Sequence, residues 1–284
     1  VKFYKAARER GIKPVFGVDA WITHDAERDA PFRALLLAQS RQGYLRLADW
    51  LSRAWRENAW RGRAEFRREW FAEGTEGLIA LSGARDGDVG HALLQGNAAA
   101  AAKAAREWAG WFPDRYYLEV QRPGHADDDA LVAATAALAA EVALPVVATH
   151  PVQYLEPADF RAHEARVCIA EGYVLADPRR PRRFTTGQHF RTQAEMAAAF
   201  ADLPEALANS VAIARRCNLT IPLGKNYLPP FPTPPGVTID EHAIGLPRKA
   251  LYPRVALVSD QLRMHVRQSR SRKPRLHIRK TPVD

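Results

Sequence analysis

The sequence has 284 residues and a formal net charge of +9, with 41 Lys or Arg against 32 Asp or Glu. This length allows a full hydrophobic core within one large α/β domain. No stretch approaches the ~18 apolar residues of a membrane span, and no secretory signal pattern is present, so we expect a cytoplasmic protein without membrane contact. The two cysteines, Cys168 and Cys217, stand in no CxxC or Cys/His cluster, so the sequence supports neither a zinc site nor a disulfide framework.

The basic charge is concentrated at the carboxyl end of the chain. Residues 242–284 hold 11 Lys or Arg against 2 Asp or Glu, whereas residues 1–241 hold 30 of each kind. The basic segment has little periodic apolar pattern, so the fold should not depend on it. The chain also begins in what reads as the middle of a helix, and its only methionines are Met196 and Met264. We therefore interpret it as a fragment of a longer protein.

The first part of the chain reads as a helix followed by two strands. Residues 2–10 are helical in composition, and residues 12–22 read as a strand with Asp19 towards its carboxyl end. Residues 34–38, ALLLA, read as a second, buried strand. Ser40 then has the right place and side chain to cap the next helix.

The same alternation of patterns continues along the chain. Residues 76–82 and 115–120 read as strands, with an Ala-rich helix between them. The RDGD turn could hold a metal through Asp86 and Asp88, but a solvated helix entry is the interpretation that we prefer. We likewise interpret the acidic run 127–129 as a helix start, where the helix dipole favours carboxylates.

A strand, a polar turn and a helix follow within residues 144–169. The apolar run 144–148 reads as a strand covered on both faces, and His150 stands where this strand would end. One face of the helix would carry Phe160, His163, Val167 and Cys168. Strands that alternate with helices in this way indicate parallel strands joined by right-handed crossovers, either in an open sheet or in a (β/α) barrel.

The last predicted elements are a helix and a linker. Asp202 and Glu205 make a D-x-x-E capping box that would start the helix, with Leu207 and Val211 on its inner side. Residues 219–235 are rich in Pro and should form an extended linker between units.

Four side chains near predicted strand ends could form a site: Asp19, Asp86, Glu119 and His150. A (β/α) barrel would gather them around one mouth, where they could bind a divalent metal for phosphoester hydrolysis. A hydrogen-bonded turn residue is the alternative interpretation at each position. No Walker A, GxGxxG or GxSxG motif appears in the right context, which leaves ATPase, dinucleotide-binding and serine-hydrolase functions without support.

Several segments, in order along the chain, resemble one known family. They include VKFYKAARERGIKPVFGVD, EGLIALSGARDGDVGHALLQGN, LPVVATHPVQYLEPADFRAHEARVCIAEG and FADLPEALANSVAIARRCNLTIPLGKNYLPPFPTP, and they run from residue 1 to about residue 241. On these segments the chain resembles the PHP (polymerase and histidinol phosphatase) domain of bacterial DNA polymerase III alpha subunits. The resemblance implies an α/β fold, namely an incomplete PHP-type (β/α)7 barrel with a helical extension and a disordered basic tail.

The resemblance also sets the expected domain boundaries. Residues 1–190 would form the barrel without its first strands, and residues 191–218 the helical extension. Residues 219–241 would be a Pro-rich linker towards a polymerase palm that this chain lacks. We expect the basic tail, residues 242–284, to be frameshifted or disordered rather than a native DNA-binding arm.

In metal-binding members of the family the barrel mouth holds His, Asp, Glu and Cys ligands. The resemblance implies that this cluster is eroded here at four positions: Arg33, Ala84, Pro151 and Gln153. The acidic position survives as Asp19, and His150 lies beside the lost positions of the last ligand strand. Two ligands would give only a weak, open metal site.

For the intact protein the resemblance implies template-directed DNA synthesis in chromosomal replication, with Mg²⁺ at palm aspartates that are absent from this chain. We expect this part to bind no cofactor, to have no catalytic residues and to be inactive alone. It would be a degenerate PHP scaffold that docks the proofreading exonuclease and contacts other replicase subunits, with DNA bound only by the intact protein. The alternatives are a free-standing PHP-type metal-dependent phosphoesterase and, more weakly, a nucleic-acid-binding protein that acts through residues 242–284.

Overall fold

The computed structural model describes residues 1–224 and 233–237. The expected linker is therefore described only in part, and the basic tail, residues 242–284, lies outside the described residues. The chain divides into two compact units, Val1–Ile221 and Pro222–Asp284, and the structure below is that of the first. None of the helices in the described residues combines the length and the apolar character that crossing a membrane requires.

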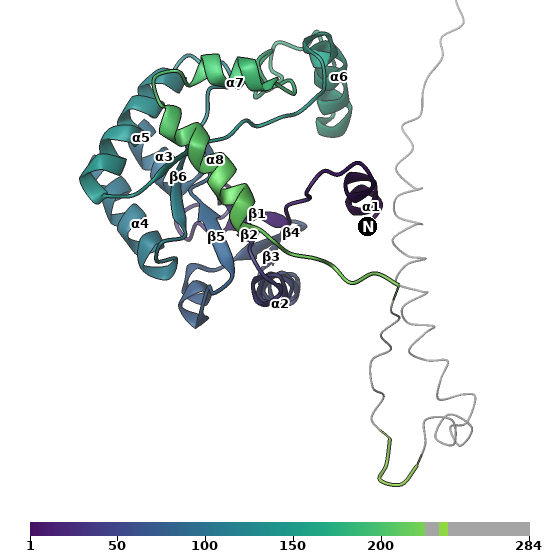
Figure 1. Cartoon of the computed structure of the whole chain (residues 1–284). Helices are drawn as coiled ribbons and strands as arrows, with labels where there is room; N and C mark the ends of the chain where they lie inside the picture. Colours follow the sequence, from purple (N-terminus) through teal and green to yellow (C-terminus); the bar gives the residue numbers. More distant parts are fainter. Residues whose placement is uncertain (225–232, 238–284) are drawn as a thin grey trace, which may run out of the picture. The chain divides into compact units, whose positions relative to one another are not determined.

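Strands and helices alternate through the first unit (Figure 1). The strands are β1 (Gly17–Ile22), β2 (Phe32–Ala38), β3 (Ala59–Trp60), β4 (Arg63–Phe66), β5 (Leu78–Leu81), β6 (Tyr116–Val120) and β7 (Val146–Ala148). The helices are α1 (Lys2–Glu9), α2 (Arg41–Glu57), α3 (Asp88–Leu94), α4 (Ala98–Trp111), α5 (Asp128–Val142), α6 (Phe160–Glu171), α7 (Gln193–Ala199) and α8 (Pro204–Arg216). Three short 3-10 helices are η1 (Arg68–Glu73), η2 (Ala84–Asp86) and η3 (Pro157–Asp159).

The strands form one open sheet in the order β3-β4-β1-β2-β5-β6-β7. The α/β class is confirmed, and the sheet does not close into a barrel within the described residues. The prediction of parallel strands is confirmed for the pairs β1–β4, β5–β6 and β6–β7. It is wrong for β2, which runs antiparallel to both β1 and β5, and for β3, which runs antiparallel to β4. The connection between β1 and β2, residues 23–31, is too short for a helical crossover, which needs a dozen or more residues. By contrast, β5, β6 and β7 are parallel and are joined through α3, α4 and α5.

Both faces of the sheet are covered. Residues of β5 alternate between two cores: Leu78 and Ala80 belong to the large one, whereas Ile79 and Leu81 belong to a smaller one. The large core lies against α2, α4 and α5, and Figure 1 shows α3, α4 and α5 grouped on one side of the strands. The smaller core is closed by Ile213 of α8 and by Cys217.

Helix α8 also contacts the edge of the sheet. Its Asn209 side chain donates a hydrogen bond from Nδ2 to the carbonyl oxygen of Val146 in β7, at 2.8 Å. Residues 191–218, expected as a helical extension, therefore pack directly on the sheet and belong to the same compact unit. Of the two residues predicted to face inwards from this helix, Leu207 packs against the large core, whereas Val211 is exposed. The buried residues of α8 are Ala206 and Ile213.

Some predicted helix starts are confirmed and one is wrong. The predicted cap at Ser40 forms, because its side chain accepts from the backbone N–H three residues further on, at the start of α2. Asn97, which the sequence did not single out, caps α4 in the same way. The predicted capping box of Asp202 does not form, because α8 starts at Pro204 without a side-chain cap. The Asp202 carboxylate instead accepts two hydrogen bonds from Arg122, at 2.7 and 2.8 Å.

The centre of the large core is an aromatic cluster around Trp108. This ring stacks on Tyr116 of β6 at a centroid distance of 5.8 Å and lies 5.0 Å from Phe71. Its Nε1 donates to the buried carboxylate of Asp88, at 3.0 Å, which also pairs with Arg68. Trp108 therefore joins α4, β6 and the start of α3 through both packing and a buried hydrogen bond.

We expect Trp108→Ala to lower the free energy of unfolding by about 3–5 kcal/mol, because it leaves a cavity and removes a donor from a buried carboxylate. The matched control is Trp55→Ala, since Trp55 is 59% exposed and surface substitutions usually change stability by within about 0.5 kcal/mol. Urea unfolding of the full chain, followed by far-UV circular dichroism, measures both values. Equal losses in the two variants would contradict the central position of Trp108.

Candidate functional site

A cleft of about 950 Å³ opens beside the carboxyl ends of several strands. Its walls come from the segments after β1, β5, β6 and β7 and from the start of β2. The four side chains predicted to meet at a barrel mouth all line it: Asp19, Asp86, Glu119 and His150. Pro151, Gln153 and Arg33 also line the cleft, whereas Ala84 is buried in η2 and does not.

Asp19 does not present a free carboxylate to the cleft. It lies in the middle of β1, opposite Leu35, and Arg33 reaches it diagonally from β2. The Arg33 guanidinium donates to both carboxylate oxygens, at 2.8 Å for Nε to Oδ1, and its centre lies 4.1 Å from the ring centroid of Trp21. A bidentate ion pair of this kind already places a positive charge beside the carboxylate, so a metal ion at Asp19 would compete with Arg33.

Glu119 lies at the base of the cleft, where its side chain is 6% exposed. Its carboxylate accepts hydrogen bonds from the backbone N–H of Gly83 at 3.1 Å, from Gln121 Nε2 at 3.1 Å and from the hydroxyl of Thr149. Gly83 has a positive φ of 77°, which glycine adopts without strain, and this turn directs its N–H at the carboxylate. Burial raises the pKa of Glu119, although these hydrogen bonds oppose the shift.

His150 is held by the backbone rather than by another candidate residue. Its Nε2 donates to the carbonyl oxygen of His189 at 2.9 Å, which leaves Nδ1 buried and without a partner among the described residues. Burial, followed by the nearby positive charge of Arg191, lowers the pKa of His150, so the ring is neutral at pH 7.

The cleft also contains residues that the sequence did not single out. The rings of His24, Phe32 and His91 follow one another along one wall, with centroid distances of 4.3 and 5.7 Å. Arg85 pairs with both oxygens of Asp127, at 2.7 and 2.8 Å, and this hydrogen bonding lowers the pKa of Asp127. No local motif marks the three rings, because Phe32 begins β2 and His91 lies in α3, and they meet only in the folded chain.

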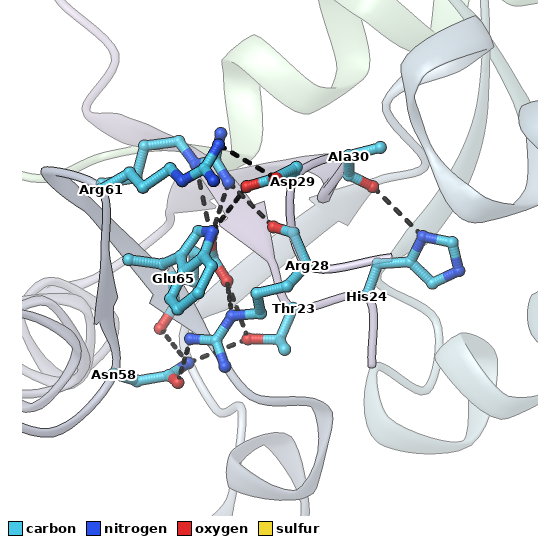
Figure 2. A network of polar contacts seen from close by, with 10 residues as sticks. Thr23, His24, Arg28, Asp29, Ala30, Asn58, Arg61 and Glu65 are labelled. Atoms are coloured by element: carbon cyan, nitrogen blue, oxygen red, sulfur yellow. Dashed lines mark hydrogen bonds and ion pairs between the residues drawn. The ribbon is translucent and has the colours of Figure 1, made fainter. Parts of the chain in front are cut away.

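The wall that carries His24 is fixed by a polar network around Glu65 of β4 (Figure 2). Glu65 has an exposed fraction of 0%. Its carboxylate accepts from Arg28 Nε at 2.9 Å and from Arg63 Nη2 at 3.0 Å, and Thr23 Oγ1 donates to it at 3.3 Å. Because Thr23 and Arg28 belong to the connection between β1 and β2, the network holds that connection against β4.

Asn58 completes the network and extends it to the backbone. Its Nδ2 donates to Thr23 Oγ1 and to the carbonyl oxygen of Glu65, both at 2.9 Å, while its Oδ1 accepts from Arg28 Nη2 at 2.6 Å. Within the connection, His24 Nδ1 lies 3.2 Å from the carbonyl oxygen of Ala30, near the other end, and donates to it.

The donor set around the cleft does not fit a divalent metal centre. No group of three or more His, Cys, Asp or Glu residues within the described part of the chain is placed to hold a metal ion. The cation beside Asp19 is the guanidinium of Arg33, and the oxygens of Glu119 are occupied by protein donors. A weak site formed by Asp19 and His150 stays a prediction.

Comparisons with known proteins show which family and which proteins this chain resembles. Residues 1–123 match the family model described as PHP domain. The chain is similar to the DNA polymerase III subunit alpha of Neisseria meningitidis, with 51% identity over 258 residues, which is 90% of this chain and 23% of the relative. The proteins of the same name from Pseudomonas aeruginosa and Escherichia coli are 49% and 41% identical, over 85% and 91% of this chain and 21% and 22% of their own lengths.

The chain thus spans less than a quarter of the length of these relatives. Since a match over 90% of the chain must include part of residues 242–284, the similarity continues beyond residue 241. The resemblance therefore extends farther than the sequence motifs indicated.

The raised pKa of Glu119 gives a test of the base of the cleft. A carboxyl group whose pKa is raised on folding contributes stability below its unfolded pKa, 4.5, and this contribution is lost as the pH rises through the folded value. We therefore expect the stability of the wild type, relative to Glu119→Gln, to fall as the pH rises above about 4.5. Urea unfolding at a series of pH values measures the difference.

The matched control is Asp127→Asn, because the pKa of Asp127 is lowered from 3.8 by Arg85. For this residue the sign reverses: the wild type gains stability relative to the variant as the pH rises through the range below 3.8. A wild-type advantage over Glu119→Gln that stays constant with pH would contradict the environment described for Glu119.

Proposed function

Because the chain belongs to the DNA polymerase III alpha subunit family and matches the PHP domain over residues 1–123, we propose that it is the PHP scaffold of a replicative DNA polymerase. In the intact protein, template-directed DNA synthesis with Mg²⁺ and DNA takes place in other parts of the molecule. This region carries out no catalytic step of its own. It supports the polymerase and docks partner subunits, among them the proofreading exonuclease.

The observation that carries the proposal is the ion pair between Arg33 and Asp19 on the cleft wall. The planar guanidinium of an arginine matches a carboxylate with two hydrogen bonds, and Arg33 makes both of them to Asp19. A metal at Asp19 would have to displace this cation and would then lack further ligands, since a stable site usually needs at least three protein donors. Because the protein supplies its own cation at this position, through Arg33, a structural role is favoured for the cleft.

The proposed partners follow from the kind of protein that the relatives are. Each relative is named as a subunit, and a subunit functions within an assembly. A region with a large apolar core and a buried polar network is a folded unit that other subunits can contact. The exonuclease is the partner that we propose for this region.

The second candidate function is a PHP-type metal-dependent phosphoesterase. The size of the cleft favours it, as does the presence of Asp86, Glu119, His91 and His150 along its walls. This function requires that a metal outcompetes Arg33 for Asp19 or binds elsewhere in the cleft.

Metal analysis separates the two functions. After incubation with Zn²⁺ or Mn²⁺, we expect the purified full chain to hold less than one metal ion per molecule and to leave p-nitrophenyl phosphate intact. Asp19→Ala should change neither result. Inductively coupled plasma mass spectrometry measures the metal content, and a colorimetric phosphatase assay measures the hydrolysis. Stoichiometric metal together with hydrolysis that Asp19→Ala abolishes would establish the phosphoesterase and overturn the scaffold.

A gain-of-ligand variant serves as the positive control. Arg33→His, Pro151→Asp and Gln153→His together place three metal-ligating side chains on the cleft and free Asp19 from its ion pair. We expect this variant to bind metal more tightly than the wild type. The result shows that the assay detects a metal site at this position when one exists.

A further inference from the structure

Helix α6 lies at the periphery of the first unit, away from the strands (Figure 1). Two of its side chains are buried, His163 and Cys168, and both lie on the helix face that the residue spacing predicts. An element that buries so few side chains opens locally at a lower free energy than the core of the protein. The attachment of α6 therefore depends largely on His163, a side chain that can become charged near neutral pH.

His163 joins α6 to two other segments of the chain. It is 5% exposed, and its ring centroid lies 4.6 Å from that of Phe184, at an interplanar angle of 86°, and 5.5 Å from that of Tyr154. Tyr154 follows β7, whereas Phe184 belongs to the segment between α6 and α7. The hydroxyl of Tyr154 donates to the carbonyl oxygen of Thr185 at 2.6 Å, so the same two segments are also joined to each other.

The hydrogen bonding of His163 requires a neutral ring. Arg166 Nη2 lies 3.1 Å from His163 Nδ1. Since a guanidinium can only donate, Nδ1 is the acceptor and the ring proton is on Nε2. This Nε2 is buried and has no hydrogen-bond partner among the described residues. A second proton would have to bind Nδ1, where it would replace the acceptor by a donor that faces the cation of Arg166.

The groups around His163 do not compensate a positive charge on its ring. On α6 itself, Arg166 is a cation, and the carboxylate of Glu164 already pairs with Arg180 at 2.6 Å. The remaining polar neighbour is the neutral hydroxyl of Tyr154, whose pKa is raised by burial. Burial, followed by the charge of Arg166, lowers the pKa of His163, and Glu164 opposes the shift.

Phe184 connects His163 to the cleft. Phe184 lines the cleft together with Arg183, Gln153 and Gln188. The backbone N–H of Gln153 donates to the carbonyl oxygen of Gln188 at 2.9 Å. This wall of the cleft is thus built by the two segments between which His163 is packed.

We propose that His163 is a proton-operated switch: protonation of its ring releases α6 and loosens the cleft wall at Phe184. A charged ring gains hydration and distance from Arg166 only when α6 moves away, so a falling pH drives the opening. The switch does not depend on which subunits the domain contacts.

Hydrogen–deuterium exchange of the full chain, followed by mass spectrometry, measures the opening. An imidazole in water has a pKa of 6.5, and in closed α6 the pKa of His163 is lower. The closed form therefore has its full stability above pH 6.5 and loses it as the pH falls towards the closed value. We expect the opening constant of α6 to rise by up to about tenfold for each pH unit in this range. After correction for intrinsic rates, residues 160–171 and 183–188 should exchange faster at about pH 5.5 than at about pH 7.5, whereas residues 98–111 of α4 should not.

Two variants test whether His163 is the group that responds. His163→Phe keeps an aromatic ring but cannot be protonated, so it should abolish the pH dependence of exchange in α6. Arg166→Gln keeps the histidine and removes the cation that faces it, so it should reduce the dependence without abolishing it. The matched control is His91→Phe, at an exposed histidine of α3, which should keep the wild-type dependence. Far-UV circular dichroism checks that each variant is folded at both pH values.

Three outcomes would overturn the switch. The first is exchange of residues 160–171 in the wild type that does not change with pH. The second is a pH dependence that persists in His163→Phe, which would assign it to another group such as His150. The third is an equal increase in every element, since that would indicate global acid unfolding. If His163→Phe does not fold, Arg166→Gln decides: an unchanged dependence excludes the switch, and a reduced one supports it.

Discussion

A buried carboxylate is the constraint on which one edge of the sheet and one wall of the cleft depend. Glu65 has no solvent exposure, and a charge in such a place is tolerated only where cations and hydrogen-bond donors surround it. Arg28 and Arg63 supply the cations, and Thr23 supplies a hydroxyl. Two of these three residues, Thr23 and Arg28, lie in the connection between β1 and β2. The contacts that compensate the charge of Glu65 therefore also fix the path of that connection. The wall that carries His24 is therefore held in place by a charge that lies outside the cleft.

The sequence predicted those elements of the fold whose signals are local. The cap at Ser40 and the apolar run at β7 each depend on residues close in the chain, and both were placed correctly. The predicted cap at Asp202 failed because Arg122, far away in sequence, engages its carboxylate. The direction of β2 could have been predicted, since residues 23–31 are too few for a crossover helix. That argument uses loop length rather than periodicity.

The sequence predicted where the candidate site lies better than it predicted which contacts its residues make. Glu119 and His150 reach the cleft from the carboxyl ends of β6 and β7, as the general geometry of α/β sheets predicts. Asp19 also lines the cleft, but from the middle of β1 and not from its predicted place at a strand end. The partner of Asp19 could not be derived in the same way, because the contact with Arg33 depends on the antiparallel register of β1 and β2. A resemblance to known sequences marked Arg33 only as a lost ligand. In the structure, Arg33 itself supplies the positive charge that pairs with Asp19.

The hydrogen bond from Asn209 to Val146 has a consequence for how separate molecules behave towards one another. β7 is the last strand of the sheet, and an uncovered last strand is a template on which a strand of another molecule can add. Asn209 occupies one of its carbonyl groups, and Ile213 of the same helix covers the apolar face beside it. Proteolytic cleavage in the segment before α8, followed by release of that helix, would uncover both features together. Self-association into oligomers would then begin at β7, long before the rest of the core had unfolded.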